Sequence, residues 1–149
     1  MRLVAKDLPL TSHRQARRAA EAARCAAVEG RYWPYRDRLF AEQGRFTEAQ
    51  LIGYAVDLGL ERATFAACVT ERRFAKDVEA DLAQARALGL GSTPSFLING
   101  RTLVGAHPTD AFRSIIEEVL NGQRGGPRVP RGSSERRGIS GTASAAPVR

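Results

Sequence analysis

Several features that define common protein classes are missing from this sequence of 149 residues. It has no run of 18 apolar residues, the length that a membrane-spanning helix requires, so we expect no membrane partner. The first residues lead into an apolar run too short for the core of a signal peptide, so the chain as written would stay in the cytoplasm. A phosphate-binding glycine loop is also missing, because Gly89 and Gly91 end a helical pattern and do not begin one.

Histidine and cysteine are scarce, which limits metal and redox chemistry. His13 and His107 show no ligand spacing to each other or to the cysteines, so we predict no metal site and no cofactor. Cys25 and Cys68 lie 43 positions apart on different predicted helices. They therefore cannot form the Cys-x-x-Cys motif of a disulfide oxidoreductase, which needs both thiols at one helix N-terminus.

The cysteine pair has three possible states. As buried thiols, Cys25 and Cys68 would be small core residues. As a disulfide they would close a loop of about 44 residues and stabilise the fold by roughly 4 kcal/mol in an oxidising compartment. A metal site lacks further ligands. The sequence leaves the choice between thiols and a structural disulfide open.

Positive charge is distributed unevenly along the chain. The formal net charge is +7, but residues 121–149 contain six arginines and one glutamate, so the first 120 residues carry only +2. Because no apolar residue recurs periodically in residues 121–149, we predict a disordered basic tail there. Scattered arginines suit nucleic-acid binding, but the tail has no aromatic residue to stack on a base. We therefore expect a solvated tail and no nucleic-acid partner.

Most of the first 120 residues show helical periodicity. Thr11 or Ser12 is expected to cap a helix that ends near Glu29, and Thr47 with Gln50 forms a capping-box pattern before another. Further helices are predicted over about residues 32–42, 60–69, 74–88 and 108–120, the last ended by Asn121 and Gly122. An aromatic and apolar cluster on the 32–42 helix is expected in the core: Trp33, Tyr35, Leu39 and Phe40.

Residues 93–105 have the pattern of a β-hairpin. Thr93-Pro94 makes a corner, residues 95–98 form an apolar run, and Asn99 with Gly100 is the strongest short signal for a hairpin turn. The apolar run of residues 3–5 predicts another, buried strand. The predicted order is strand, about five helices, strand, turn, strand and helix.

Residues 91–100, GSTPSFLING, together with residues 103–106, LVGA, resemble the cis-proline loop and hairpin of DsbA-like thioredoxin-fold proteins. The helices of about residues 11–88 stand where that family inserts a helical block. The resemblance implies an α/β, thioredoxin-like fold with a helical insertion, mostly helical by residue count, in a domain of residues 1–120. It also implies a cis Thr93-Pro94 bond.

The resemblance implies protein thiol-disulfide exchange, with thiol- or disulfide-bearing proteins or peptides as substrates. Thr93 and Pro94 would bind an extended substrate segment beside the reactive sulfur. The family's Cys-x-x-Cys helix comes before the equivalent of Leu3, so we expect an N-terminally truncated member that lacks the first strand and the active-site helix. No catalytic residue is then predicted in this chain. Family members typically act in the periplasm.

A non-catalytic module is the alternative interpretation. A sheet without its first strand would have an open edge, and such an edge binds an extended peptide or pairs with a second copy of the chain. The same corner at Thr93 and Pro94 would then serve binding alone.

Overall fold

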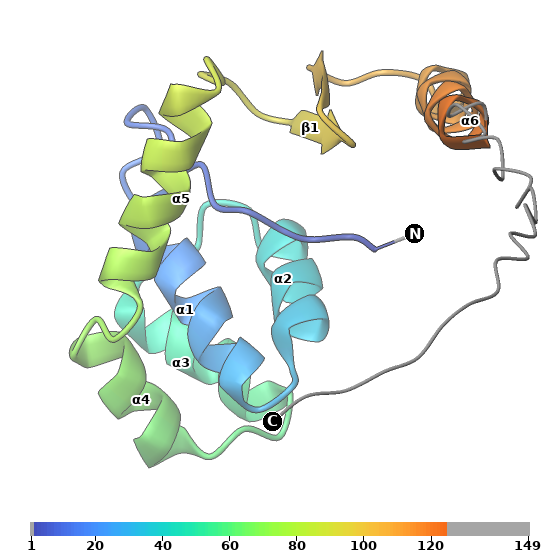
Figure 1. Cartoon of the computed structure of the whole chain (residues 1–149). Helices are drawn as coiled ribbons and strands as arrows, with labels where there is room; N and C mark the ends of the chain where they lie inside the picture. The colour runs from blue at the N-terminus through green and yellow to red at the C-terminus, as the bar shows by residue number, and fades with distance from the viewer. Residues whose placement is uncertain (1, 125–149) are drawn as a thin grey trace, which may run out of the picture.

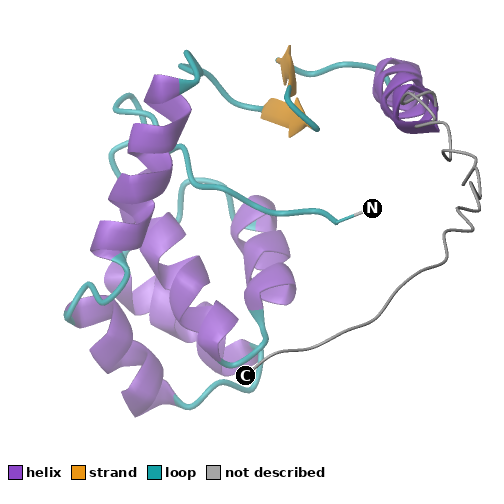
Figure 2. Cartoon of the chain, in the orientation of Figure 1, coloured by secondary structure: helices purple, strands orange, loops and turns teal. Residues whose placement is uncertain are grey.

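The computed structural model describes residues 2–124, and residues 125–149, most of the expected basic tail, lie outside this described part. The described elements are α1 (Ala16–Val28), α2 (Tyr32–Ala41), α3 (Glu48–Asp57), α4 (Arg62–Thr70), α5 (Ala75–Ala87), β1 (Ser95–Ile98), β2 (Arg101–Val104) and α6 (Thr109–Arg124) (Figure 1). Helix dominates by residue count, as Figure 2 shows, so the prediction of a mostly helical α/β chain is confirmed.

Helices α1 to α4 pack around one apolar core, and α5 packs against α1. The inner side of α1 consists of small residues, and Ala22 and Ala26 have no exposed surface, so neighbouring helices approach closely. Larger side chains fill the remaining space, among them Tyr35, Leu51 and Phe65. The Tyr35 hydroxyl donates a hydrogen bond to the Leu51 carbonyl at 2.9 Å, which satisfies the buried phenol.

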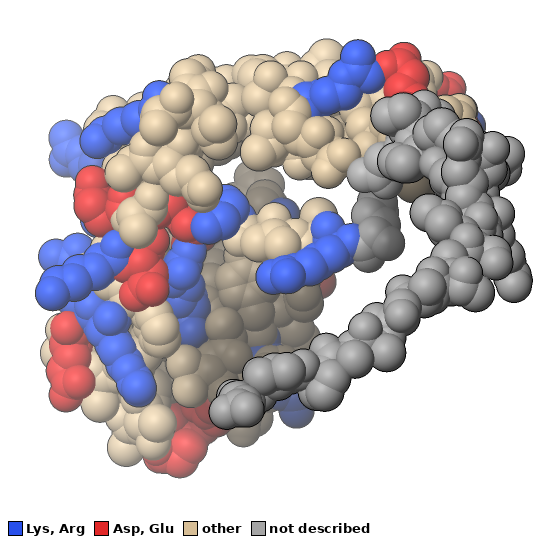
Figure 3. All heavy atoms as spheres, in the orientation of Figure 1, with Lys and Arg blue, Asp and Glu red and all other residues tan. Residues whose placement is uncertain are grey.

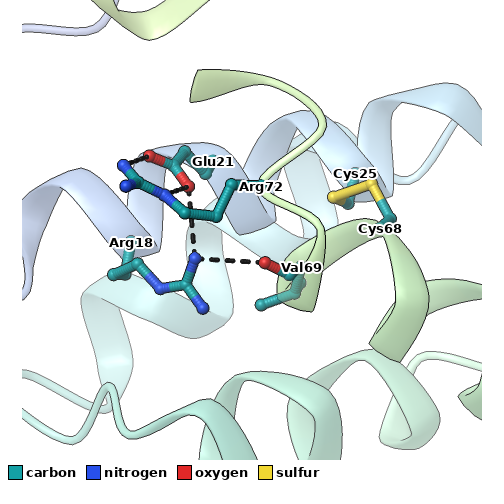
Figure 4. The surroundings of a disulfide bond; sticks show 6 residues. All are labelled: Arg18, Glu21, Cys25, Cys68, Val69 and Arg72. Atoms are coloured by element: carbon teal, nitrogen blue, oxygen red, sulfur yellow. Dashed lines mark hydrogen bonds and ion pairs between the residues drawn. A yellow bond between two sulfur atoms is a disulfide. The ribbon is translucent and has the colours of Figure 1, made fainter.

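A disulfide joins Cys25 of α1 to Cys68 of α4. Of the states that the sequence left open for this pair, the structure therefore has the disulfide and not two free thiols. Both residues are buried, at 4% and 8% exposure. One turn before Cys25, the buried Glu21 accepts hydrogen bonds from Arg72 at 2.8 Å and from Arg18 at 3.4 Å (Figure 4). A covalent bond and an ion-pair cluster therefore hold α1 against α4 side by side.

The start of α1 differs from the prediction. The helix begins only after Gln15, whose side chain makes no capping hydrogen bond, so the predicted caps Thr11 and Ser12 are wrong. The preceding residues form turns, in which the His13 amide donates to the Leu10 carbonyl at 3.0 Å. These turns take residues 11–15 out of the helical path.

Local signals at α3 and at the hairpin are confirmed. Thr47 and Gln50 form a reciprocal capping box at the start of α3. β1 and β2 pair antiparallel in a register that leaves Asn99 and Gly100 as the connecting turn. Both have positive φ, 49° and 89°, as a type I′ turn requires. The Thr93-Pro94 peptide bond before β1 is cis.

The predicted buried strand at residues 3–5 does not form. Among residues 2–124 the sheet consists of β1 and β2, and residues 2–10 have no regular secondary structure. Leu3 is 74% exposed and Val4 52%, so the prediction is wrong in both pairing and burial. The physical reason is that a strand needs a neighbour to complete its backbone hydrogen bonds, and no such neighbour is present in the described part of the chain.

The aromatic residues of α2 lie on two different faces. Tyr35 is buried as predicted, but Trp33 and Phe40 are 44% and 61% exposed, so their predicted place in the core is wrong. They are seven positions apart and share the outer face of the helix, opposite Tyr35. The Arg36 guanidinium lies over both rings, 5.7 Å and 4.5 Å from their centroids.

α6 packs on the hairpin. The Phe96 and Phe112 rings meet edge to face at 4.7 Å between centroids, and Arg101 pairs with Glu118. Figure 1 shows the hairpin and α6 extending away from the helical bundle. α6 continues through Asn121 and Gly122, so the predicted stop there is wrong. One glycine costs only about 1 kcal/mol inside a helix, too little to end a helix by itself.

Replacing both Cys25 and Cys68 with alanine is expected to lower the free energy of unfolding by roughly 4 kcal/mol, because the unfolded chain regains the entropy of a 44-residue loop. Urea denaturation of the oxidised protein and the variant measures the difference. Because both sulfurs are buried, a phosphine reductant should open the bond in the wild type only when denaturant is present. Equal urea midpoints for both proteins would contradict a stabilising disulfide.

Candidate functional site

Thr93 and Pro94 lie where the chain leaves α5 and enters β1. The Pro94 carbonyl accepts a hydrogen bond from the Gly105 amide at 2.8 Å, which ties the corner to the end of β2. The Ser95 hydroxyl donates a hydrogen bond to the Ser92 carbonyl at 2.6 Å, which stabilises the turn formed by residues 92–95. Thr93 is exposed, and its amide and carbonyl have no hydrogen-bond partner within residues 2–124. Its backbone is therefore available to an extended peptide.

The edge of β1 that faces away from β2 is unpaired in the described part of the chain. The bond from Gly105 to Pro94 sets the alternation of the antiparallel ladder. By that alternation the backbone groups of Ser95 and Leu97 point to the open edge. Leu97 is 51% exposed. In Figure 3, drawn in the orientation of Figure 1, open space separates the atoms along the top of the view, where β1 lies, from those of the helical bundle below. The corner at Thr93 thus continues into a strand edge that can accept another strand.

A pocket of about 520 Å³ opens beside this corner. Four segments contribute its lining residues: Leu8, Leu10, His13, Arg14, Gln15, Ala16, Gly44, Phe46 and Thr93. The structure brings Thr93 and His13 to one cavity, a relation that no sequence pattern indicates. They lie on segments far apart in the chain, so no spacing rule could have found this pair.

The cysteines lie elsewhere. Cys25 and Cys68 are bonded to each other in the contact between α1 and α4, and neither lines the pocket. Within residues 2–124, no three or more histidine, cysteine, aspartate or glutamate side chains are grouped so that they could hold a metal ion. The site therefore offers backbone groups, apolar walls and positive charge, without a thiol.

A partly buried ion-pair cluster fixes the segment that leads into the pocket. Asp81 of α5 accepts hydrogen bonds from the Lys6 ammonium at 2.7 Å and from the Asp7 amide at 3.0 Å. Arg24 of α1 donates to the Asp7 carboxylate at 2.6 Å and also to Asp81. This cluster anchors the residues just before Leu8 against two helices of the bundle.

The two carboxylates of the cluster respond to it in opposite ways. Burial raises the pKa of Asp7 above its usual 3.8, against the hydrogen bond and the charge of Arg24. Burial also opposes ionisation of Asp81, but the hydrogen bonds from Lys6 and from the Asp7 amide, with the charge of Arg24, outweigh it and lower the pKa of Asp81. Asp81 is therefore the carboxylate whose charge the fold stabilises.

Asp81→Asn is expected to lower the free energy of unfolding near pH 6 by about 1–3 kcal/mol, because it removes the carboxylate partner of Lys6 and leaves Arg24 with Asp7 alone. The pKa of Asp81 is lowered in the folded state, so its contribution is present above pH 3.8 and is lost as the pH falls through the folded-state value. Urea titrations from pH 7 down to about pH 2 should therefore show the two proteins converging below pH 3.8.

Glu79→Gln is the matched control, because Glu79 lies on the same helix in an exposed ion pair with Arg17. It should change stability by less than about 1 kcal/mol at any pH. A constant difference between wild type and Asp81→Asn across the whole pH range would show that the charge of Asp81 is not what stabilises the cluster.

Comparison with known proteins relates this geometry to a family. A family model described as "Thioredoxin" matches residues 1–118. The "Na(+)/H(+) antiporter NhaA 1" of Salinispora arenicola is 35% identical over 140 residues, which are 93% of this chain and 22% of that protein. The "Na(+)/H(+) antiporter NhaA" of Herminiimonas arsenicoxydans is 36% identical over 124 residues, 83% of this chain and 20% of that protein.

A third relative, the "Na(+)/H(+) antiporter NhaA" of Nitrosospira multiformis, is 37% identical over 121 residues, 80% of this chain and 19% of that protein. The chain thus spans about a fifth of the length of these curated relatives. Within residues 2–124, no helix has the length and apolar character needed to cross a membrane. Because the family model covers most of the sequence, the chain belongs to the thioredoxin family and has a thioredoxin-like fold.

Proposed function

We propose that this chain is the substrate-binding part of a DsbA-like thiol-disulfide oxidoreductase. The observation that supports it best is the exposed corner at Thr93 and Pro94, where a backbone without partners continues into the open edge of β1. The free amide and carbonyl of Thr93 bind an extended peptide through backbone hydrogen bonds. The edge of β1 beyond Thr93 is left for the strand that leads into the Cys-x-x-Cys helix, so substrate and strand do not compete. In this proposal, Thr93 holds the substrate segment so that its sulfur faces the reactive cysteine.

Thiol-disulfide exchange needs a thiolate that attacks one sulfur of the substrate disulfide and releases the other as a thiolate. A second thiol then attacks the mixed disulfide and frees the substrate. Cys25 and Cys68 are bonded to each other and buried, so neither serves as this nucleophile in the folded chain. We therefore assign the reactive pair to a Cys-x-x-Cys segment that is not among these 149 residues, and assign binding and orientation of the substrate to this chain.

The longer relatives carry the name of sodium-proton antiporters. This chain matches only about a fifth of their length. The proposal for this chain is accordingly limited to the chemistry of a thioredoxin-like domain. We propose that the domain acts as a module of a longer polypeptide of this kind, where its substrates are extended segments that carry a thiol or a disulfide.

A non-catalytic role is the second candidate, and two observations favour it. The described residues contain no free cysteine, and the open hairpin exposes the apolar residues Leu97 and Val104 at 51% and 49%. Such a strand edge also pairs with a second copy of the chain or holds a peptide without any redox step. Activity measurements separate the two candidates.

Insulin reduction by dithiothreitol provides the test. The chain alone is expected to leave the rate at the level of buffer, because its cysteines are bonded and buried. The comparison is a version extended at its N-terminus by the residues encoded upstream or, where these lack the motif, by the strand and Cys-x-x-Cys helix of a DsbA-like protein. The extended version is expected to accelerate insulin precipitation.

The matched control is the extended version with the first cysteine of the added motif replaced by serine, which should return the rate to that of buffer. An extended version that folds but does not turn over would favour the non-catalytic module. Turnover by the chain alone would contradict both the non-catalytic candidate and the assignment of the reactive thiols to another segment.

A further inference from the structure

The pocket beside Thr93 gives the proposed site a means of selecting its substrate. We propose that this pocket is a specificity subsite that accepts an apolar side chain of the extended peptide, with an acidic residue two positions away on the same face. This inference rests on the proposed function, because it needs a peptide held along Thr93. It adds the kind of sequence that the site prefers.

The walls of the pocket are apolar. Leu8, Leu10 and Phe46 are half-buried and line it, and Phe46 also packs against the core of the bundle, which holds that wall in place. The volume of about 520 Å³ lies within the range of small-ligand sites and exceeds what one leucine or phenylalanine side chain requires. An apolar side chain entering here gains the free energy of leaving water.

The mouth of the pocket is basic. His13 and Arg14 line it and are exposed, and no aspartate or glutamate is among the lining residues. Arg17 and Arg18, on the next turn, are each paired with carboxylates, Arg17 with Glu79 at 2.5 Å. Arg14 has no ion pair within residues 2–124. A carboxylate on the ligand would supply this cation with a partner.

The position of Thr93 connects the pocket to the strand edge. Thr93 lines the pocket with one side and presents an unpaired backbone to solvent. A peptide paired there is extended, so its side chains alternate between two faces at about 3.3 Å per residue. A residue within one or two positions of Thr93 then lies at the mouth, and the residue two positions further along, on the same face of the peptide, reaches the rim where Arg14 lies.

Fluorescence anisotropy of the full chain with three labelled dodecapeptides tests the subsite. Each peptide has a glycine- and serine-rich frame around a central Leu-Gly-Glu, Ala-Gly-Glu or Leu-Gly-Lys segment; these are the Leu-Glu, Ala-Glu and Leu-Lys peptides. Relative to the Leu-Glu peptide, the Ala-Glu peptide should bind about tenfold more weakly, because it leaves the pocket empty. The Leu-Lys peptide should bind about two- to fivefold more weakly, since surface charge pairs are weak. Equal affinities, or no binding of any peptide, would overturn the proposal.

Arg14→Glu should reverse the charge preference, so that the Leu-Lys peptide binds more tightly than the Leu-Glu peptide. Arg62→Glu is the matched control, because Arg62 is exposed at the first position of α4 and does not line the pocket. Circular dichroism checks that both variants fold. A loss of preference in Arg62→Glu as large as in Arg14→Glu would show an unspecific charge effect and would overturn the proposal.

The outcomes separate this inference from the proposed function. Insulin turnover by the extended version, without discrimination among the three peptides, rejects the subsite alone. Discrimination among the peptides without turnover rejects the redox role and keeps the pocket as a peptide-binding site. If sedimentation shows a dimer whose formation abolishes peptide binding, a second copy of the chain occupies the pocket, and the subsite is rejected.

Discussion

Backbone hydrogen bonding in strands is the constraint on which the rest of this structure depends. A strand is stable when its amides and carbonyls have partners on a neighbouring strand. The described chain supplies one pair, β1 with β2, and leaves the other edge of β1 open. Leu3 and Val4 are exposed, and the backbone of Thr93 and the outer edge of β1 are unpaired, because within residues 2–124 neither segment has a further strand beside it.

The helical bundle is stable in a different way, which lets the open edge persist. Small residues on α1 allow close packing, the bond between Cys25 and Cys68 ties α1 to α4, and Glu21 pairs with Arg72 next to it. None of these contacts uses the hairpin. Phe46, which packs against the core of the bundle, lines the same pocket as Thr93. The well-packed bundle therefore forms one wall of the proposed peptide site.

The features that were predicted correctly from the sequence are those that depend on only a few neighbouring residues. The hairpin turn at Asn99 and Gly100 needs only positive φ, and the capping box at Thr47 needs only a side chain three positions on. The strand at residues 3–5 was wrong because apolar character cannot show whether a partner strand is present. The pairing of His13 with Thr93 in one pocket depends on how distant segments pack, which no local pattern contains.

The most direct measurement of the central claim is hydrogen exchange at the amides of Ser95 and Leu97, which point away from β2. In the chain alone, both amides should exchange nearly as fast as in an unfolded peptide, while the amides that pair β1 with β2 are slowed. Addition of the strand and Cys-x-x-Cys helix should slow Ser95 and Leu97 by at least about a hundredfold. Protection of both amides in the chain alone would contradict the account, because the edge would then already have a partner.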